Sequence, residues 1–227
     1  MLQHYAGIMT NPAAVLWDMD GTLVDTEPYW IRAETELMNA HGISWSEEQG
    51  LEFVGNDLLT SAAMMQDAGL DLPAAVIVDT LLDEVVAKIE EAVPFRPGAL
   101  EFLAAIVTDG IPCVMVTMSY RRLAEAVISA CPEGSFVGLI SGDEVTAGKP
   151  DPEPYLKGAA LLELDPGACV ALEDSKPGLA SAEAAGTIAI GIPHLVALEE
   201  RPGRILWSSL EGRGIADLRE LTSRQSV

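Results

Sequence analysis

Short apolar runs alternate with amphipathic segments over the second half of the chain. The runs that have the length of buried strands are 112–116, 136–140, 168–172 and 187–190. Helical patterns lie around them at 98–108, 120–130, 153–162 and 178–185. Because helices and strands that alternate with short connections place the strands parallel, this pattern predicts an α/β fold with a doubly wound parallel sheet.

A further apolar run at 13–17 predicts a strand of the same sheet, although a long helical stretch separates it from the others. Helical patterns in that stretch cover 29–40, 56–68 and 73–92, and prolines follow at 94 and 97. The simplest account is an inserted helical domain. We therefore expect a core formed by 1–26 and 95–227 and an insertion at 27–94. No element is predicted after Glu199, where five arginines favour a solvated surface.

Composition narrows the class of protein. With 35 acidic and 13 basic residues, the formal net charge of the 227-residue chain is −22, which makes nucleic acid a poor partner. No apolar run approaches the length that spans a bilayer, and the N-terminus does not resemble a signal peptide. The three cysteines are far apart in apolar runs, as expected of buried thiols. We expect a cytoplasmic protein with no membrane partner; its oligomeric state cannot be read from these features.

Polar groups follow four of the predicted strands, at the end where parallel sheets bind ligands. They are Asp18 and Asp20 after the first strand, Thr117 and Met118 after the second, Lys149 beyond the third, and Glu173 and Asp174 after the fourth. The carboxylates supply hard oxygen ligands that suit Mg²⁺, and Lys149 offsets the charge of a phosphate. Thr117 can bind a phosphate oxygen, and Asp20 can exchange protons. Taken singly, Asp18 or Asp174 and Ser175 could instead cap helices.

This combination resembles the haloacid dehalogenase superfamily, in its β-phosphoglucomutase-like and phosphoglycolate phosphatase-like branch. The matching motifs are Asp-x-Asp-Gly-Thr at 18–22, the strand-end Thr117, Gly-Lys-Pro at 148–150, and Glu-Asp-Ser-x-x-Gly at 173–178. One departure is Met118, where relatives often have Asn; only its backbone N–H could then meet phosphate.

The resemblance implies a Rossmann-like core, an inserted helical cap that closes over the substrate, and an aspartyl-phosphate on Asp18 with Asp20 as acid and base. It implies a Mg²⁺ site formed by Asp18, Asp20, Glu173 and Asp174, with Glu173 bound either directly or through water. It places phosphate-binding groups at Thr117, Met118 and Lys149. It also places a specificity loop around Gly55, Asn56 and Asp57.

The family's other reactions fit the sequence less well. Dehalogenases replace the second Asp, and phosphonatases need a cap lysine, but no Lys or Arg lies between Arg32 and Lys88. The same gap disfavours a phosphohexomutase, whose bisphosphate needs a second cation, unless Arg32, Lys88 or Arg96 turns inward. A non-catalytic regulator would have damaged motifs, and none is missing. We therefore expect a phosphatase acting on a small phosphorylated metabolite, a sugar or polyol monophosphate.

Overall fold

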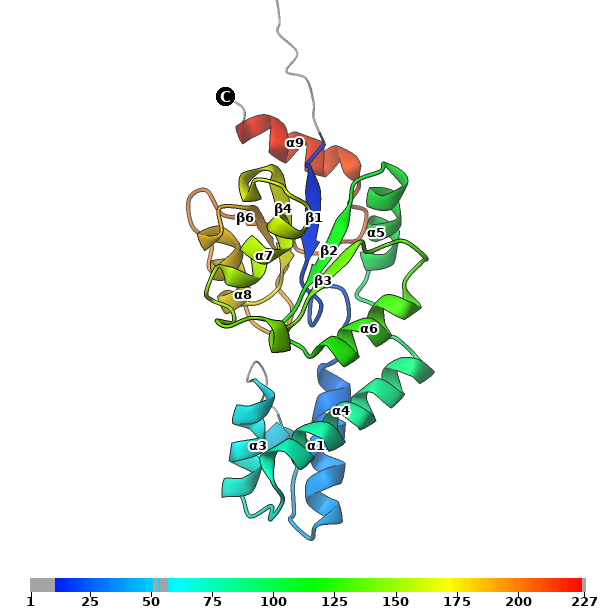
Figure 1. Ribbon diagram of the computed structural model, residues 1–227, viewed down its shortest axis with the longest axis vertical. Helices are drawn as coiled ribbons and strands as arrows, with labels where there is room; N and C mark the ends of the chain where they lie inside the picture. The colour runs from blue at the N-terminus through cyan, green and yellow to red at the C-terminus, as the bar shows by residue number, and fades with distance from the viewer. Residues whose placement is uncertain (1–10, 51–52, 54–56, 226–227) are drawn as a thin grey trace, which may run out of the picture.

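The computed structural model describes residues 11–50, 53 and 57–225, and its core is a six-stranded parallel sheet (Figure 1). The strand order is β3-β2-β1-β4-β5-β6. The strands are β1 (Ala14–Trp17), β2 (Cys113–Val116), β3 (Gly138–Ile140), β4 (Cys169–Glu173), β5 (Ile188–Gly191) and β6 (Ile205–Leu206). The chain winds from the central β1 outward in both directions, which confirms the predicted doubly wound fold.

Both faces of the sheet are buried. Successive side chains of each strand point to opposite sides, so each strand contributes to two apolar layers. Val15 and Trp17 of β1 join one apolar layer, and Ala14 and Leu16 join the other. The first layer packs against α5 (Ala99–Thr108), α6 (Arg121–Ala130) and α9 (Ile215–Gln225). The second packs against α7 (Glu153–Leu161) and α8 (Lys176–Ala184). Two short 3-10 turns, η2 (Gly142–Glu144) and η3 (Pro166–Ala168), complete the core.

In the described part of the insertion, four helices form the helical cap of the fold. They are α1 (Glu27–Ala40), α2 (Glu47–Gly50), α3 (Leu58–Asp67) and α4 (Ala74–Glu91). Figure 1 places α1, α3 and α4 together, beyond the end of the sheet at which the strands terminate. The two linkers to the core pair with each other: the Asp25 N–H donates to the Pro94 carbonyl at 2.8 Å, and the Arg96 N–H donates to the Leu23 carbonyl at 2.9 Å. The domain limits at 27 and 94 stay a prediction.

The part of the chain after Glu199 differs from the expectation. It forms the edge strand β6 and helix α9, which lies at the end of the sheet opposite the cap (Figure 1). Strand β6 has two residues, too few for a pattern, but Ile215, Leu218 and Leu221 recur at helical spacing, and Leu218 is fully buried. The arginines of this segment favoured a solvated surface, so the sequence predicted no helix there. None of the helices in the described part of the chain is long and apolar enough to cross a membrane.

Candidate active site

Three carboxylates meet at the end of the two central strands. Asp18 follows β1, Glu173 ends the neighbouring β4, and Asp174 comes next; the pairing of Trp17 with Leu172 sets these residues side by side. Each offers an oxygen, and the three oxygens lie within 4.8 Å of one another. Asp18 is 6% exposed and Glu173 is fully buried. The structure therefore brings together three of the four carboxylates that the sequence predicted at this edge, and their role as metal ligands stays a prediction.

Lys149 enters this group from the connection between β3 and α7. Its ammonium lies 2.6 Å from Asp18 Oδ1 and 2.7 Å from Glu173 Oε1, and it donates to the Val116 carbonyl at 2.9 Å. The side chain is 5% exposed, so its charge acts in a poorly solvated environment. One buried cation thus bridges two of the carboxylates.

Burial and the charges of their neighbours shift the pKa values of Asp18, Asp174 and Lys149. Burial, with the charge of Glu173 in second place, raises the pKa of Asp18 well above its usual range, although Lys149 opposes the shift. The same two causes raise the pKa of Asp174 to about 7. Burial alone would lower the pKa of Lys149, but the Asp18 and Glu173 carboxylates raise it above its ordinary value. Lys149 therefore stays charged, whereas the carboxylates lack sufficient positive charge.

Glu173 is held by neighbours that the sequence did not identify. The Tyr155 hydroxyl, from α7, donates to Glu173 Oε1 at 2.6 Å, and the Ser175 hydroxyl lies 3.2 Å from Oε2. A Cβ at Gly178 would come within 2.0 Å of the same carboxylate. Tyr155 is fully buried and was indistinguishable from an apolar core residue; its place two residues into the helix after Lys149-Pro150 was the available signal. Ser175 also caps α8, so a capping and a site role coexist.

Asp20 lies apart from the acidic group. Its Oδ1 accepts from the Thr26 hydroxyl at 2.5 Å, and its Oδ2 accepts from the Ser119 hydroxyl at 2.7 Å and the Thr117 hydroxyl at 3.2 Å. The structure thus joins Thr117 to Asp20 and adds Ser119 and Thr26, two hydroxyls that the sequence did not assign to this site. The predicted roles of Asp20 as a metal ligand and of Thr117 as a phosphate ligand stay predictions.

Gly21 allows the chain to turn between Asp20 and the following helix. Its φ is +84°, and a Cβ there would lie 2.1 Å from Asp174 Oδ2. Only glycine meets both conditions without strain. The Thr22 hydroxyl, 3.4 Å from Asp174 Oδ1, is a long contact to the same carboxylate.

Met118 supports the segment that carries Lys149. Its sulfur accepts from the Lys149 backbone N–H at 3.2 Å, and a Cβ at Gly148 would lie 3.3 Å from that sulfur. The thioether therefore packs under the Gly-Lys-Pro segment, at the position where relatives often have Asn. The expected contact of the Met118 backbone N–H with phosphate stays a prediction.

The donor set fits a divalent cation that prefers oxygen. Asp18 Oδ2 is buried and has no hydrogen-bond partner among the described residues, and it belongs to the group with Glu173 and Asp174. A buried anionic oxygen without a partner is costly, and a cation beside it would remove that cost. Hard oxygen donors of this kind suit Mg²⁺, Mn²⁺ or Ca²⁺ and do not distinguish among them.

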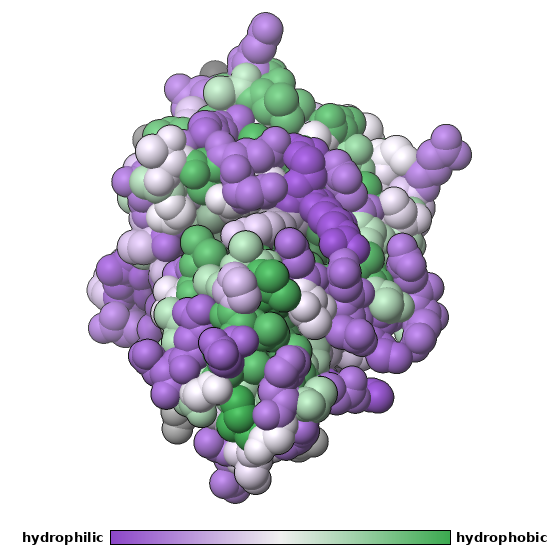
Figure 2. Space-filling model, turned by 60° about the horizontal axis from the view of Figure 1, so that its bottom comes forward, coloured by the Kyte–Doolittle hydropathy of each residue, from purple (hydrophilic) through white to green (hydrophobic). Residues whose placement is uncertain are grey.

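The predicted specificity loop is only partly described. Gly55 and Asn56 lie outside the described residues. The exposed Asp57 carboxylate caps α3: it accepts hydrogen bonds from the backbone N–H groups of Leu59 and Thr60 at 3.1 and 3.0 Å. Figure 2, which brings the cap end forward, shows hydrophilic residues on both sides of an apolar strip.

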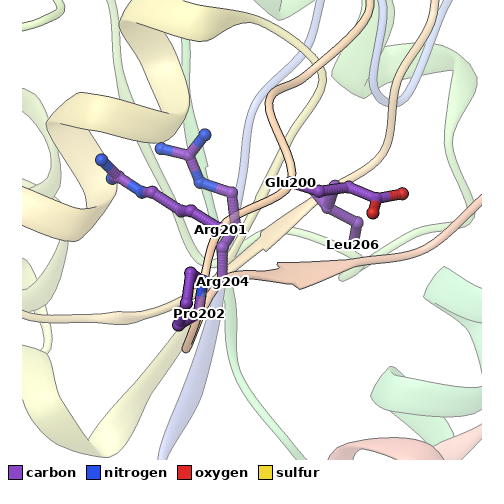
Figure 3. A pocket seen from close by; sticks show the side chains of 5 residues that line it. All are labelled: Glu200, Arg201, Pro202, Arg204 and Leu206. Atoms are coloured by element: carbon purple, nitrogen blue, oxygen red, sulfur yellow. The ribbon is translucent and has the colours of Figure 1, made fainter.

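A surface hollow of about 500 Å³ lies elsewhere, near β6. Its lining residues are Glu200, Arg201, Pro202, Arg204 and Leu206 (Figure 3). Figure 3 shows the two guanidinium groups on one side and Glu200 pointing away from them. Both arginines are paired with Glu183, so this hollow offers no free cation for an anionic ligand. The chemistry of the carboxylate edge makes that edge the candidate site.

Comparison with known proteins gives the same family as the motifs. Residues 12–186 match the model of the haloacid dehalogenase-like hydrolases. Hexitol phosphatase B of Escherichia coli (strain K12) is 31% identical over 191 residues, covering 79% of this chain and 83% of the relative. N-acetylmuramic acid 6-phosphate phosphatase of Pseudomonas aeruginosa is 36% identical over 181 residues, covering 77% and 78%.

Solved structures agree with this result. CbbY from Rhodobacter sphaeroides, crystallised with phosphate, is 31% identical, with a TM-score of 0.81 over 92% of this chain and 99% of that one. A mutant of the same protein, crystallised with xylulose-1,5-bisphosphate, is 30% identical with the same TM-score and coverage. The chain therefore belongs to the haloacid dehalogenase-like hydrolases, as a phosphoric monoester hydrolase of that family.

Proposed function

We propose that the chain is a Mg²⁺-dependent phosphatase that hydrolyses a sugar or polyol monophosphate through an aspartyl-phosphate on Asp18. The observation that carries the proposal is the state of the Asp18 carboxylate. Lys149 holds one oxygen, at 2.6 Å, and the other oxygen is buried beside Glu173 and Asp174 with no partner in the described part of the chain. A nucleophile with one oxygen on a cation and the other available to a metal ion suits attack on an anionic phosphate.

Asp18 and Asp174 are the residues that would hold the metal directly. Both oxygens of Glu173 already have partners, Tyr155 and Lys149 on one and Ser175 on the other, which favours a supporting role for this residue. A bound Mg²⁺ would neutralise phosphate oxygens and lower the barrier to attack by a carboxylate. Lys149, at the other oxygen of Asp18, reduces the repulsion between this carboxylate and the phosphate.

In the first half of the reaction, a carboxylate oxygen of Asp18 forms a bond to phosphorus and the bond between phosphorus and the leaving alcohol breaks. Asp20 gives its proton to the alcohol oxygen. The three hydroxyls around Asp20 can donate or accept, so they can hold it in either protonation state. This assignment explains why Asp20 lies apart from the acidic group.

In the second half, water attacks phosphorus of the aspartyl-phosphate. Asp20, now ionised, takes the proton from the water, the bond between phosphorus and Asp18 breaks, and inorganic phosphate leaves. The Thr26, Thr117 and Ser119 hydroxyls hold Asp20 in place for this transfer. The two halves return both carboxylates to their starting states.

The charge of the cap supports a monophosphate. Arg32 pairs with Glu36 and Lys88 pairs with Glu91, so the cations of the described cap are already engaged. A second phosphate would enter a cap without a free cation. The relatives named for hexitol and N-acetylmuramic acid 6-phosphate favour a phosphorylated sugar or polyol. The net charge of −22 favours a small substrate over nucleic acid.

A phosphohexomutase is the second candidate, because the CbbY complex contains a sugar bisphosphate. The test is phosphate release from a panel of sugar and polyol monophosphates and matched bisphosphates, with Mg²⁺ and with chelator. We expect Mg²⁺-dependent release from a few monophosphates. No release from any monophosphate, together with interconversion of a hexose phosphate primed by its bisphosphate, would establish the mutase instead.

A further inference from the structure

One histidine of the core lies between the two linkers that carry the cap. His194 belongs to the connection between β5 and β6. Its Nδ1 contacts the Arg96 guanidinium, and its Nε2 lies 3.1 Å from Asp25 Oδ1. Asp25 is part of the first linker and Arg96 is part of the second. A single side chain of the core therefore contacts both linkers.

The chemistry of the two neighbours assigns the tautomer of His194. A guanidinium can only donate, so Nδ1 has to accept, and the proton of a neutral ring lies on Nε2, facing Asp25. The His194 side chain is 14% exposed, and its buried Nε2 lies near Asp25 without a hydrogen bond to any described residue. A neutral histidine can serve a donor and an acceptor at the same time, which neither Lys nor Glu can do.

The same histidine is connected to the catalytic edge on both sides. Two residues before it, the Ile192 N–H donates to the Glu173 carbonyl at 2.6 Å, which ties the loop to the acidic group. Next to Asp25, Thr26 donates its hydroxyl to Asp20 Oδ1 at 2.5 Å. A movement of Asp25 would therefore carry Thr26 with it and change the support of Asp20.

We propose that His194 is a positioning residue that ties both linkers to the core, and so keeps the cap in place and Thr26 within reach of Asp20. It does not touch the substrate in this role. It acts through Asp25 and Thr26 on the proton donor, and through Asp25 and Arg96 on the orientation of the cap.

The protein contains an internal comparison for this role. Arg122 of α6 pairs with Asp83 of α4, which also joins core and cap. Both side chains are more than half exposed, at 55% and 60%, and an exposed ion pair contributes little. The partly buried contacts of His194 should therefore control the cap far more than the exposed pair does.

The kinetic test compares two phosphate esters, and it rests on the proposed function. An alkyl ester such as sorbitol 6-phosphate needs a proton from Asp20 as its alcohol leaves, whereas p-nitrophenyl phosphate does not. For His194→Ala we expect kcat/KM to fall about tenfold with sorbitol 6-phosphate and less than about threefold with p-nitrophenyl phosphate. His194→Gln, whose amide can accept from Arg96 and donate to Asp25, should restore most of the loss.

Controls separate this role from a general loss of folded enzyme. Leu195→Ala alters an exposed neighbour in the same loop, and Arg122→Ala breaks the exposed pair; both should leave the two values unchanged. An equal fall with both esters in His194→Ala, or a His194→Gln variant as slow as His194→Ala, would overturn the proposal.

A distance measurement tests the same idea without any substrate, so its outcome is independent of the proposed function. The three native cysteines are buried, and burial raises the pKa of Cys113 to about 12 and those of Cys131 and Cys169 to about 11. Spin labels should therefore attach only to cysteines introduced at two exposed sites, Asp71 of the cap and Glu133 of the core.

We expect the distribution of distances between these labels to broaden in His194→Ala and to return to its original width in His194→Gln. If His194→Ala proves too unstable, Arg96→Met provides a second variant that removes one of the two contacts, and it should broaden the distribution as well. An unchanged distribution in both His194→Ala and Arg96→Met would refute the positioning role, whatever the kinetics.

Discussion

The carboxylate edge of the sheet and helix α1 of the cap both bury carboxylates, but the neighbours of these carboxylates differ. At the edge, Glu173 is fully buried and meets Lys149 and the Tyr155 hydroxyl at 2.7 and 2.6 Å. In the cap, Glu34 is 4% exposed, and its Oε2 has no partner among the described residues. The nearby cation of the same helix, Arg32, is bound to Glu36.

The difference shows two ways of tolerating a buried acid. At the edge, a fixed cation and hydroxyl donors lie against Glu173, whereas burial and the charge of Glu173 raise the pKa values of Asp18 and Asp174, which need a further cation to stay ionised. In the cap, burial and then the charge of Glu27 raise the pKa of Glu34 to about 8, so this acid stays protonated at neutral pH. The edge thus supplies a cation and hydroxyl groups to its buried acids, whereas the cap leaves Glu34 to be neutralised by protonation.

The largest expected effect comes from removing the nucleophile. Asp18→Asn should lower turnover at least about 1,000-fold, because no other group in the proposed mechanism forms the bond to phosphorus. Mass spectrometry should find no phosphorylated protein. The matched variant Asp20→Asn should slow turnover but let a phosphoenzyme persist. Near-normal activity in Asp18→Asn would refute the mechanism.

Removing the shared cation should come next. Lys149→Met leaves Asp18 and Glu173 without positive charge, and unpairing a buried ion typically costs about 3–5 kcal/mol of unfolding free energy. Denaturant titration in chelator should show this loss, and added Mg²⁺ should recover part of it. Lys157→Met, which removes an exposed lysine paired with Glu153, is the control. Equal stability of the two variants in chelator would contradict the view that a fixed cation stabilises the buried acids of the edge.

Replacing the buried cap acid, Glu34, should raise stability in a pH-dependent way, whereas Lys149→Met lowers it. Because the pKa of folded Glu34 is about 8 and its ordinary value is 4.5, the unfolded chain loses this proton first, and stability falls as pH rises from about 4.5 to about 8. Glu34→Gln should abolish that loss and stabilise the protein by about 2 kcal/mol at pH 8, below an upper limit of about 5 kcal/mol set by the shift.

The measurement is the free energy of unfolding of wild type and variant between pH 5 and pH 9. Glu36→Gln, on the exposed side of the same helix, should retain the wild-type profile apart from a small loss of its ion pair with Arg32. A Glu34→Gln profile that runs parallel to the wild type would show that Glu34 is charged in the folded protein.

The smallest effect should come from the hydroxyl that supports Glu173. Tyr155→Phe keeps the packing of a fully buried ring but removes the donor at 2.6 Å, which should cost about 1–2 kcal/mol of stability. Binding of Mg²⁺, followed by calorimetry, should weaken about tenfold because Glu173 loses part of its orientation. Unchanged metal affinity would assign Tyr155 a packing role only.

Much of the fold and of the site could be predicted because the relevant signals are local. The alternation of apolar runs and helical patterns predicted five of the six strands, and parallel strands bring their carboxyl ends to one edge. Asp18, Lys149, Glu173 and Asp174 follow predicted strands directly or by a short loop, so their meeting could be foreseen. The two-residue β6 could not, since it is too short to carry a period.

The sequence by itself thus determined which strands supply polar residues, the edge of the sheet at which those residues lie, and the shortage of cations in the cap. Only the tertiary structure decided which partners each group has. The contact of Lys149 with Asp18 joins residues 131 positions apart, and the contact of His194 with Arg96 joins residues 98 apart. The physical reason is that periodicity reports burial along one element, whereas hydrogen bonds and ion pairs depend on how separate elements pack against one another.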